Sequence, residues 1–145
     1  MERPSKKFAI IIDGSLTAGV SINTAAHLSA QLGSMIPELG GSPVMDASGV
    51  SHTGLPIYPN AILQATAEEI CQVISKARQA ARGDGIIILD YPEQGHTTMT
   101  DEAYRQEMAL VHEASLKYLG LLLYGERTEV NCLTRGLKLW QASQL

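Results

Sequence analysis

The feature that most constrains the fold is an apolar run that leads straight into a glycine-bearing loop and a helix. Residues 8–12 (Phe-Ala-Ile-Ile-Ile) are typical of a buried strand, and this strand is expected to end at Asp13. The loop 14–21 follows, and residues 22–33 have a helical pattern that Ser21 can cap. α/β proteins usually build a ligand site where a strand, a loop and a helix N-terminus succeed one another. We therefore expect a ligand pocket beside this segment.

Two later apolar runs predict further strands at residues 85–89 and 118–124. The first is a continuous Gly-Ile-Ile-Ile-Leu run, typical of a strand covered on both faces, and Asp90 follows it. Between residues 35 and 65 glycines and prolines recur, which favours a short hairpin at 44–53 over a long helix. Together these elements predict a three-layer α/β/α fold with a mixed sheet of about four main strands.

Three more helices are predicted in the second half of the chain. A capping box, Thr-Ala-Glu-Glu, places a helix start at Thr66. Thr98 or Thr100 is expected to cap a second helix that runs to about Lys117, and a short helix is expected at 129–134. The length of 145 residues is that of a single domain, 1–145.

Composition restricts the location and the partners. No apolar run approaches the roughly 18 residues that cross a bilayer, so we expect no membrane contact and a cytoplasmic location. The net charge is −4 and the eleven Lys and Arg residues are scattered, which argues against a nucleic-acid partner. Cys71 and Cys132 have no metal-ligand spacing and are expected to be small buried apolar residues.

Several common kinds of catalytic site are not supported. Gly14, Gly19 and Ser21 have the spacing of a P-loop, but Val20 occupies the place of its phosphate-binding lysine. The chain has no Gly-x-Ser-x-Gly elbow, and its four histidines lack the paired spacing of zinc ligands. No cofactor and no metal are therefore expected.

Five polar residues are the main candidates for a site. Asn23 and His27 share a polar helix stripe, which is either a solvated face or the border of the loop pocket. His52 lies in the predicted hairpin, where a surface position is the alternative. Asp13 and Asp90 each end a strand, and parallel strands would bring both carboxylates to one edge of the sheet; a turn or capping role is equally open.

The two ends of the chain together resemble the type II peptidyl-tRNA hydrolases. The matching positions are Lys7, Asp13, Leu16, Gly19, Ala25, Ala26 and Ala30 near the start, and Leu119, Gly120, Gly125, Val130, Asn131, Thr134 and the Leu-Lys-Leu-Trp of residues 137–140 near the end. The centre is similar to a neighbouring, uncharacterised bacterial family of unknown function, at Asn23, Asp46, the His-Thr-Gly of residues 52–54 and the start of the strand 118–124. This resemblance implies a peptidyl-tRNA hydrolase II-like fold and would allow a homodimer.

The sequence differs from those hydrolases at the positions of their functional lysines. Positions at which they carry lysines in the loop and first helical turn hold Val20 and Ile22. Each missing charge-assisted contact removes roughly 1.5–3 kcal/mol of binding, which disfavours a tRNA phosphate as ligand.

These residues are compatible with two functions. The favoured one is a protein that binds a small, neutral or modestly polar ligand, for which the candidate residues are Gly19, Ser21, Asn23, His52 and Asp90. The alternative is a hydrolase of an ester or amide, with Asp13 or His27 as the catalytic base. In that case the backbone N–H groups of Ser21 and Ile22 would stabilise the oxyanion.

Overall fold

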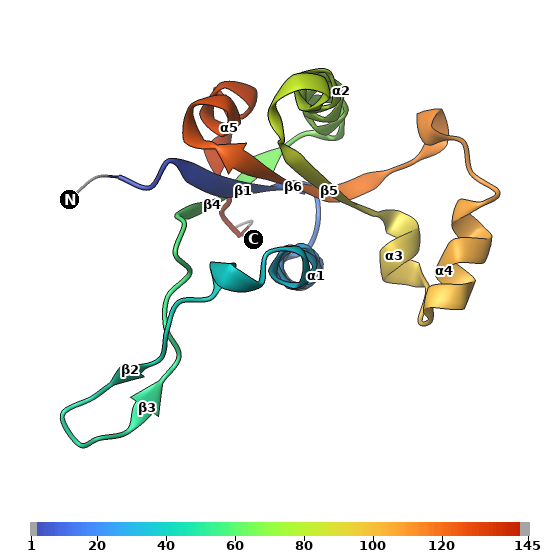
Figure 1. The fold of residues 1–145 in the computed structure, drawn as a ribbon. Coiled ribbons are helices and arrows are strands. Elements are labelled where there is room, and N and C mark those ends of the chain that lie inside the picture. Colours follow the sequence, from blue (N-terminus) through green and yellow to red (C-terminus); the bar gives the residue numbers. More distant parts are fainter. Residues whose placement is uncertain (1–2, 143–145) are drawn as a thin grey trace.

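The computed structural model describes residues 3–142 as a mixed sheet with helices on both faces (Figure 1). Helix α1 covers one face, and α2 and α5 cover the other. The strands of the sheet lie in the order β5 (Ile87–Pro92), β6 (Tyr118–Glu126), β1 (Lys6–Asp13), β4 (Asn60–Ala65) and β7 (Lys138–Leu139). The helices are α1 (Ala18–Met35), α2 (Ala67–Asp84), α3 (Glu93–Thr97), α4 (Asp101–Met108) and α5 (Arg127–Leu133), with short 3-10 helices at Pro37–Leu39 and Glu113–Ser115.

The first predicted strand lies at the centre of the sheet. β1 pairs in parallel with β4, from Phe8 opposite Asn60 onward, and antiparallel with β6. Ile11 and Ile12 of β1 are fully buried on opposite faces, because one belongs to the cluster under α2 and α5 and the other to the cluster under α1. The expectation of a mixed α/β sheet is therefore confirmed, with β7 as a two-residue addition to four longer strands.

The strand β4 was not predicted, although it pairs with the central strand over its whole length. Its sequence, Asn-Ala-Ile-Leu-Gln-Ala, has only two large apolar residues and lacks the β-branched enrichment that marks a strand. Leu63 and Ala65 are buried in the core, whereas Ile62 stays 39% exposed on the other face. Pairing with β1, which is a tertiary effect, decides the conformation of this segment.

Helix α1 begins earlier than predicted, and Ser21 does not cap it. The cap is Thr17, whose side chain accepts a hydrogen bond from the backbone N–H of Val20. Ser21 lies inside the helix and is buried, and its hydroxyl oxygen has no hydrogen-bond partner among the described residues. The buried residues of α1 are Ser21, Thr24, Leu28 and Leu32. Thr24 approaches Gly120 so closely that a Cβ at Gly120 would lie 2.7 Å from the Thr24 methyl group.

The predictions for the other helices are confirmed in place and corrected in length. Thr66 caps α2 by accepting a hydrogen bond from the N–H of Glu69. Thr100, the second of the two predicted caps, begins α4, but this helix ends at Met108 and does not reach Lys117. Within the described chain, no helix is both long and apolar enough to cross a membrane.

Both cysteines are exposed, which corrects the expectation that they are buried. Cys71 lies on α2 and Cys132 on α5, and neither takes part in a disulfide. Each helix buries its larger apolar residues, such as Ile70 and Val130, and leaves the cysteine on the outer side.

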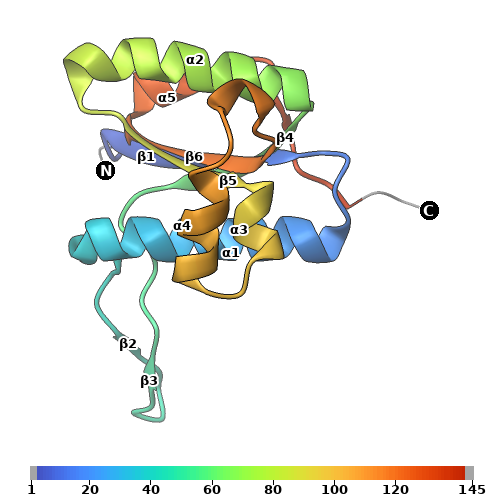
Figure 2. The same cartoon turned by 90° about the vertical axis from the view of Figure 1, so that its right-hand side faces the viewer.

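The predicted hairpin is present and projects away from the sheet (Figure 2). We call residues 41–56, which include β2 (Val44–Met45) and β3 (Ser51–His52), the arm. The two segments of the arm meet at its base, where the N–H of Gly41 donates to the carbonyl of Leu55 at 3.0 Å. The carboxylate of Asp46 holds the tip by accepting hydrogen bonds from the N–H groups of Ser48 and Val50 at 2.8 and 3.0 Å.

Candidate functional site

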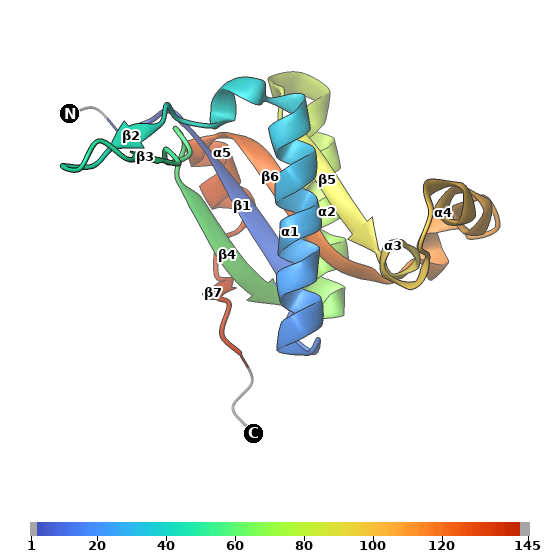
Figure 3. The same ribbon diagram turned by 90° about the horizontal axis from the view of Figure 1, so that it is seen from below.

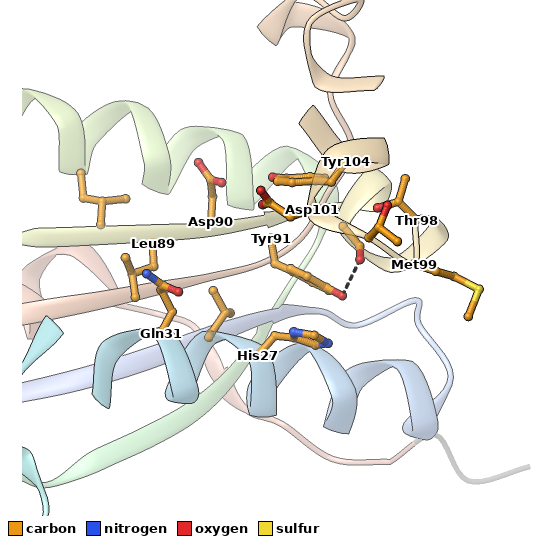
Figure 4. Close-up of a pocket in the computed structure, with 13 residues that line it drawn as sticks. His27, Gln31, Leu89, Asp90, Tyr91, Thr98, Met99, Asp101 and Tyr104 are labelled. Atoms are coloured by element: carbon orange, nitrogen blue, oxygen red, sulfur yellow. Dashed lines mark hydrogen bonds between the residues drawn. The ribbon is translucent and has the colours of Figure 1, made fainter. Parts of the chain in front are cut away.

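A cleft of about 550 Å³ lies along the edge strand β5, between α1 on one side and α3 and α4 on the other (Figure 4). The strand contributes four successive residues, 88–91, so side chains from both of its faces border the cleft. The polar and aromatic residues of the lining are His27, Gln31, Asp90, Tyr91, Thr98, Thr100, Asp101 and Tyr104.

His27 and Tyr91 form one wall of the cleft. The imidazole of His27, on the second turn of α1, stacks on the phenol ring with 4.9 Å between ring centroids and 16° between ring planes. Tyr91 is itself buried, whereas His27 is exposed and makes no hydrogen bond with another described residue. The imidazole therefore keeps its nitrogens available to a ligand while the ring below fixes its position.

The opposite wall is the short segment that carries α3. The hydroxyl of Tyr91 donates a hydrogen bond to the carbonyl of Gly95 at 3.0 Å. A Cβ at Gly95 would lie 2.7 Å from the Tyr91 ring, so glycine is required for this close approach. Thr98 ends the turn by donating to the carbonyl of Gln94 at 2.6 Å, and this contact positions the loop that leads to α4.

Asp90 lies on the opposite face of β5 from Tyr91, toward α2 (Figure 4). Part of the residue is exposed on the edge strand, but the protein around its carboxyl group removes water, and this desolvation raises the pKa above its ordinary value of 3.8. The positive charge of Arg78 on α2 opposes the shift, and the charge of Glu113 adds to it. Arg78 is itself paired with Glu113, which leaves Asp90 only partly neutralised.

The tyrosines of the cleft respond to the same surroundings. Desolvation raises the pKa of Tyr91, and the nearby Tyr104 adds to the effect. Desolvation also raises the pKa of Tyr104, with a further contribution from the charge of Asp90. Both phenols thus stay protonated. The Tyr91 proton is already donated to the carbonyl of Gly95, so Tyr104 is the phenol that can donate a hydrogen bond to a ligand.

Of the residues predicted for the site, the structure brings His27 and Asp90 to this cleft. Asn23 lies on the exposed side of α1, one turn before His27, and is not part of the lining. Gly19 lies in the first turn of α1, where a Cβ would meet nothing within 4 Å, so packing does not require a glycine there. His52 lies on the arm, paired with Asp46 at 2.9 Å.

Asp13 borders a different cavity, of about 560 Å³, at the ends of the parallel strands β1 and β4. It is only 3% exposed, and one of its carboxylate oxygens accepts hydrogen bonds from the N–H and the hydroxyl of Ser15 at 2.9 and 2.7 Å. β5 and β1 run in the same direction because both are antiparallel to β6. They are separated by that strand, however, and the carboxylates of Asp13 and Asp90 border separate cavities.

The expectation that the N–H group of Ser21 is free to stabilise an oxyanion is wrong, because α1 begins earlier than predicted. Since the helix begins at Ala18, the N–H of Ser21 already donates to the carbonyl of Thr17 at 3.0 Å. Among residues 3–142, no three His, Cys, Asp or Glu side chains are grouped as a metal site would require.

Tyr91, Tyr104 and Gln31 were not singled out as site residues from the sequence. Gln31 was visible as the next member of the stripe that contains His27, one turn further along the helix. Tyr91 follows Asp90 directly, but only the tertiary fold places its ring under His27. No local sequence pattern indicates that Tyr104 belongs to the site, because the turn around Gly95 brings α4 close to β5 only in the folded chain.

Comparisons with known proteins place the chain without assigning an activity. Residues 6–141 match a family described as a protein of unknown function, DUF2000. A solved structure of a protein of unknown function from Agrobacterium tumefaciens strain C58 superposes with a TM-score of 0.84 at 24% identity, over 95% of this chain and 99% of that one. At this identity the likeness concerns the fold alone. No curated protein gives a significant match.

Proposed function

Because the chain belongs to the DUF2000 family, whose members are described only as proteins of unknown function, we propose a function from the geometry of its own cleft. The protein binds a small polar ligand, neutral or positively charged, between α1, β5 and α4. The observation that carries this proposal is the convergence of His27, Asp90, Tyr91 and Tyr104 on one cleft. Three of these groups have pKa values shifted by desolvation, as is common in ligand sites.

The charges of the cleft support this class of ligand. The lining contains two carboxylates, Asp90 and Asp101, and no lysine or arginine among its described residues. Asp101 is paired with Arg105 at 2.6 Å, and the charge of Arg78 acts on Asp90 from α2, so Asp90 is the carboxylate to which an amine or amide of a ligand could donate. The imidazole of His27 offers a flat surface for a planar part of the ligand.

The test is a screen of small amines, amides and amino acids for compounds that raise the melting temperature. For any hit, His27→Ala and Tyr91→Leu are expected to weaken binding about tenfold or more, since each removes part of the stacked wall. His112→Ala is the matched control, because this histidine is exposed outside the cleft. The proposal is abandoned if no compound binds, or if a hit binds all three variants as tightly as the wild type.

A hydrolase that acts on an ester or amide is the second candidate, and the unpaired imidazole of His27 favours it. His27 would accept a proton from water, and the phenol of Tyr104 would donate to the leaving group or oxyanion. Under this candidate, cleavage of a model N-acyl ester falls at least about tenfold in His27→Ala and is unchanged in His112→Ala. Equal rates in all three proteins exclude it.

We also propose that the fold is peptidyl-tRNA hydrolase II-like and that the protein is located in the cytoplasm.

A further inference from the structure

The arm carries an unusual amount of uncovered apolar surface. Val44, Met45 and Val50 are 56%, 62% and 53% exposed, and Figure 2 shows the arm extending away from the rest of the chain. A two-stranded hairpin of this kind is marginal in water unless it packs on something. Exposed hairpins are normally protected by charges, yet residues 41–56 contain only Asp46 and His52 as ionisable groups, and these pair with each other.

Close backbone contacts at the base of the arm fix its orientation. A Cβ at Gly41 or Gly54 would collide with backbone atoms of the facing segment, so both glycines allow the two segments of the arm to approach each other. The isolated bridge between Gly40 and Pro56 and the hydrogen bond from Gly41 to Leu55 close the base. A preorganised arm loses little conformational entropy when it binds.

A groove without charged residues lies beside that base. It has a volume of about 500 Å³ and is lined mainly by apolar residues, among them Phe8, Ile10, Ile36, Leu39, Pro56 and Ile62. The groove exists because α1 contacts β5, β6 and β1, while β4 lies to the side of the helix on this face of the sheet (Figure 3). The same chain thus contains an apolar projection and an apolar groove that the projection does not fill.

The total surface is also large for one compact chain. The accessible area is 9450 Å², whereas a compact monomer of 15.6 kDa is expected to expose about 7,250 Å². The chain is therefore less compact than an average monomer of its mass, and the projecting arm leaves apolar surface uncovered.

We propose that the arm docks on a second copy of this chain, with Val44, Met45 and Val50 of each protomer packed against the groove at the base of the other protomer's arm. A two-fold arrangement satisfies both contacts at once, because two antiparallel arms place each tip beside the partner's base. The hydrogen bond between Asp46 and His52 leaves both polar side chains partnered in this interface. This inference goes beyond the ligand cleft and does not depend on it, since arm and groove lie apart from the cleft lining.

The test measures the molar mass of the purified full chain by sedimentation velocity over a range of concentrations. The wild type is expected to be a dimer. Met45→Glu on the arm and Ile62→Lys in the groove are each expected to raise the dimer dissociation constant about tenfold or more. Leu110→Glu is the matched control, because this apolar residue is 84% exposed and lies outside arm and groove.

Mixing the two variants distinguishes this interface from any other. An equimolar mixture of Met45→Glu and Ile62→Lys is expected to restore a dimer, because one contact stays wild type and the other pairs Glu with Lys. Circular dichroism of each variant checks that the fold is intact. A monomeric wild type at all concentrations overturns the proposal, and so does a dimer that the arm and groove variants leave unchanged. A folded pair of variants that does not recover in the mixture overturns it as well.

Discussion

Asp90 holds a carboxylate on an edge strand under conditions that disfavour its charge. Desolvation raises its pKa above the ordinary value of 3.8, so its contribution to stability is greatest below that pH and is lost as the pH rises through the folded pKa. Asp90→Asn is therefore expected to increase the free energy of unfolding at pH 7, with the gain shrinking as the pH falls toward 3.8. Urea denaturation at several pH values measures this.

The control for Asp90 is Glu102→Gln, which removes a carboxylate from the exposed side of α4. It should leave stability nearly unchanged at pH 7, as surface substitutions usually do. A loss of stability in Asp90→Asn at pH 7 would contradict the argument and would show that attraction to Arg78 outweighs the desolvation.

A second prediction concerns the reactivity of the thiols of Cys71 and Cys132. Because both thiols are exposed on the outer sides of helices, both should react with a thiol reagent in the native protein as fast as they do in the unfolded chain, within about tenfold. Mass spectrometry counts the labels on each cysteine. Slow labelling of either residue would show that its helix is covered in solution.

At the level of residues, the sequence predicted two members of the cleft, His27 and Asp90, because a helical stripe and a strand end are local patterns. It could not predict the stacking of His27 on Tyr91, which depends on how α1 lies across β5. The burial of cysteine was predicted from the general tendency of this residue and was wrong, since larger apolar residues already fill the inner faces of both helices.

At the level of elements, the contact of α1 with β6 depends on the absence of a side chain at Gly120. Gly120→Ala would place a Cβ 2.7 Å from the Thr24 methyl group and 3.0 Å from the carbonyl oxygen of Ile11. Such overpacking is expected to cost about 1–3 kcal/mol of the free energy of unfolding, which denaturant titration measures. Combining it with Thr24→Ser should recover part of the loss, because the methyl group is then absent while the hydroxyl remains.

Gly33→Ala, in α1, is the contrasting substitution to Gly120→Ala in β6. A Cβ there meets nothing within 4 Å, so the change should raise stability by about 0.5–1 kcal/mol through helix propensity alone. If both glycine variants shift stability in the same direction, close packing between α1 and β6 does not explain the result for Gly120.

Elements with strong local signals were predicted well, and those fixed by tertiary pairing were not. The apolar runs of β1, β5 and β6 and the capping threonine of α2 needed only neighbouring residues for recognition. β4 was not predicted, because its sequence is weakly strand-like and its conformation depends on its pairing with β1. The cap of α1 was misplaced by four residues, since Ser21 and Thr17 are both suitable cap types and only the structure distinguishes them.

At the level of the whole molecule, the order of the strands predicts how the backbone exchanges hydrogen with the solvent. β1 and β6 have a paired strand on both sides, whereas β5 and β7 lie at the edges. Amide protons of β1 and β6 should therefore exchange slowest and those of β7 fastest, because edge strands open at lower free energy. Mass spectrometry of peptic fragments tests this, and equal protection of β7 and β1 would be inconsistent with the sheet order.

The position of β1 also has a consequence for how the chain is made. The central strand is complete once Asp13 has been synthesised, but its antiparallel neighbour β6 starts only at Tyr118. A nascent chain that has reached the end of α4 therefore has β1 and β4 in full, with the second edge of β1 unpaired and its buried isoleucines half covered. During translation this edge stays without its partner strand until β6 leaves the ribosome and completes the sheet.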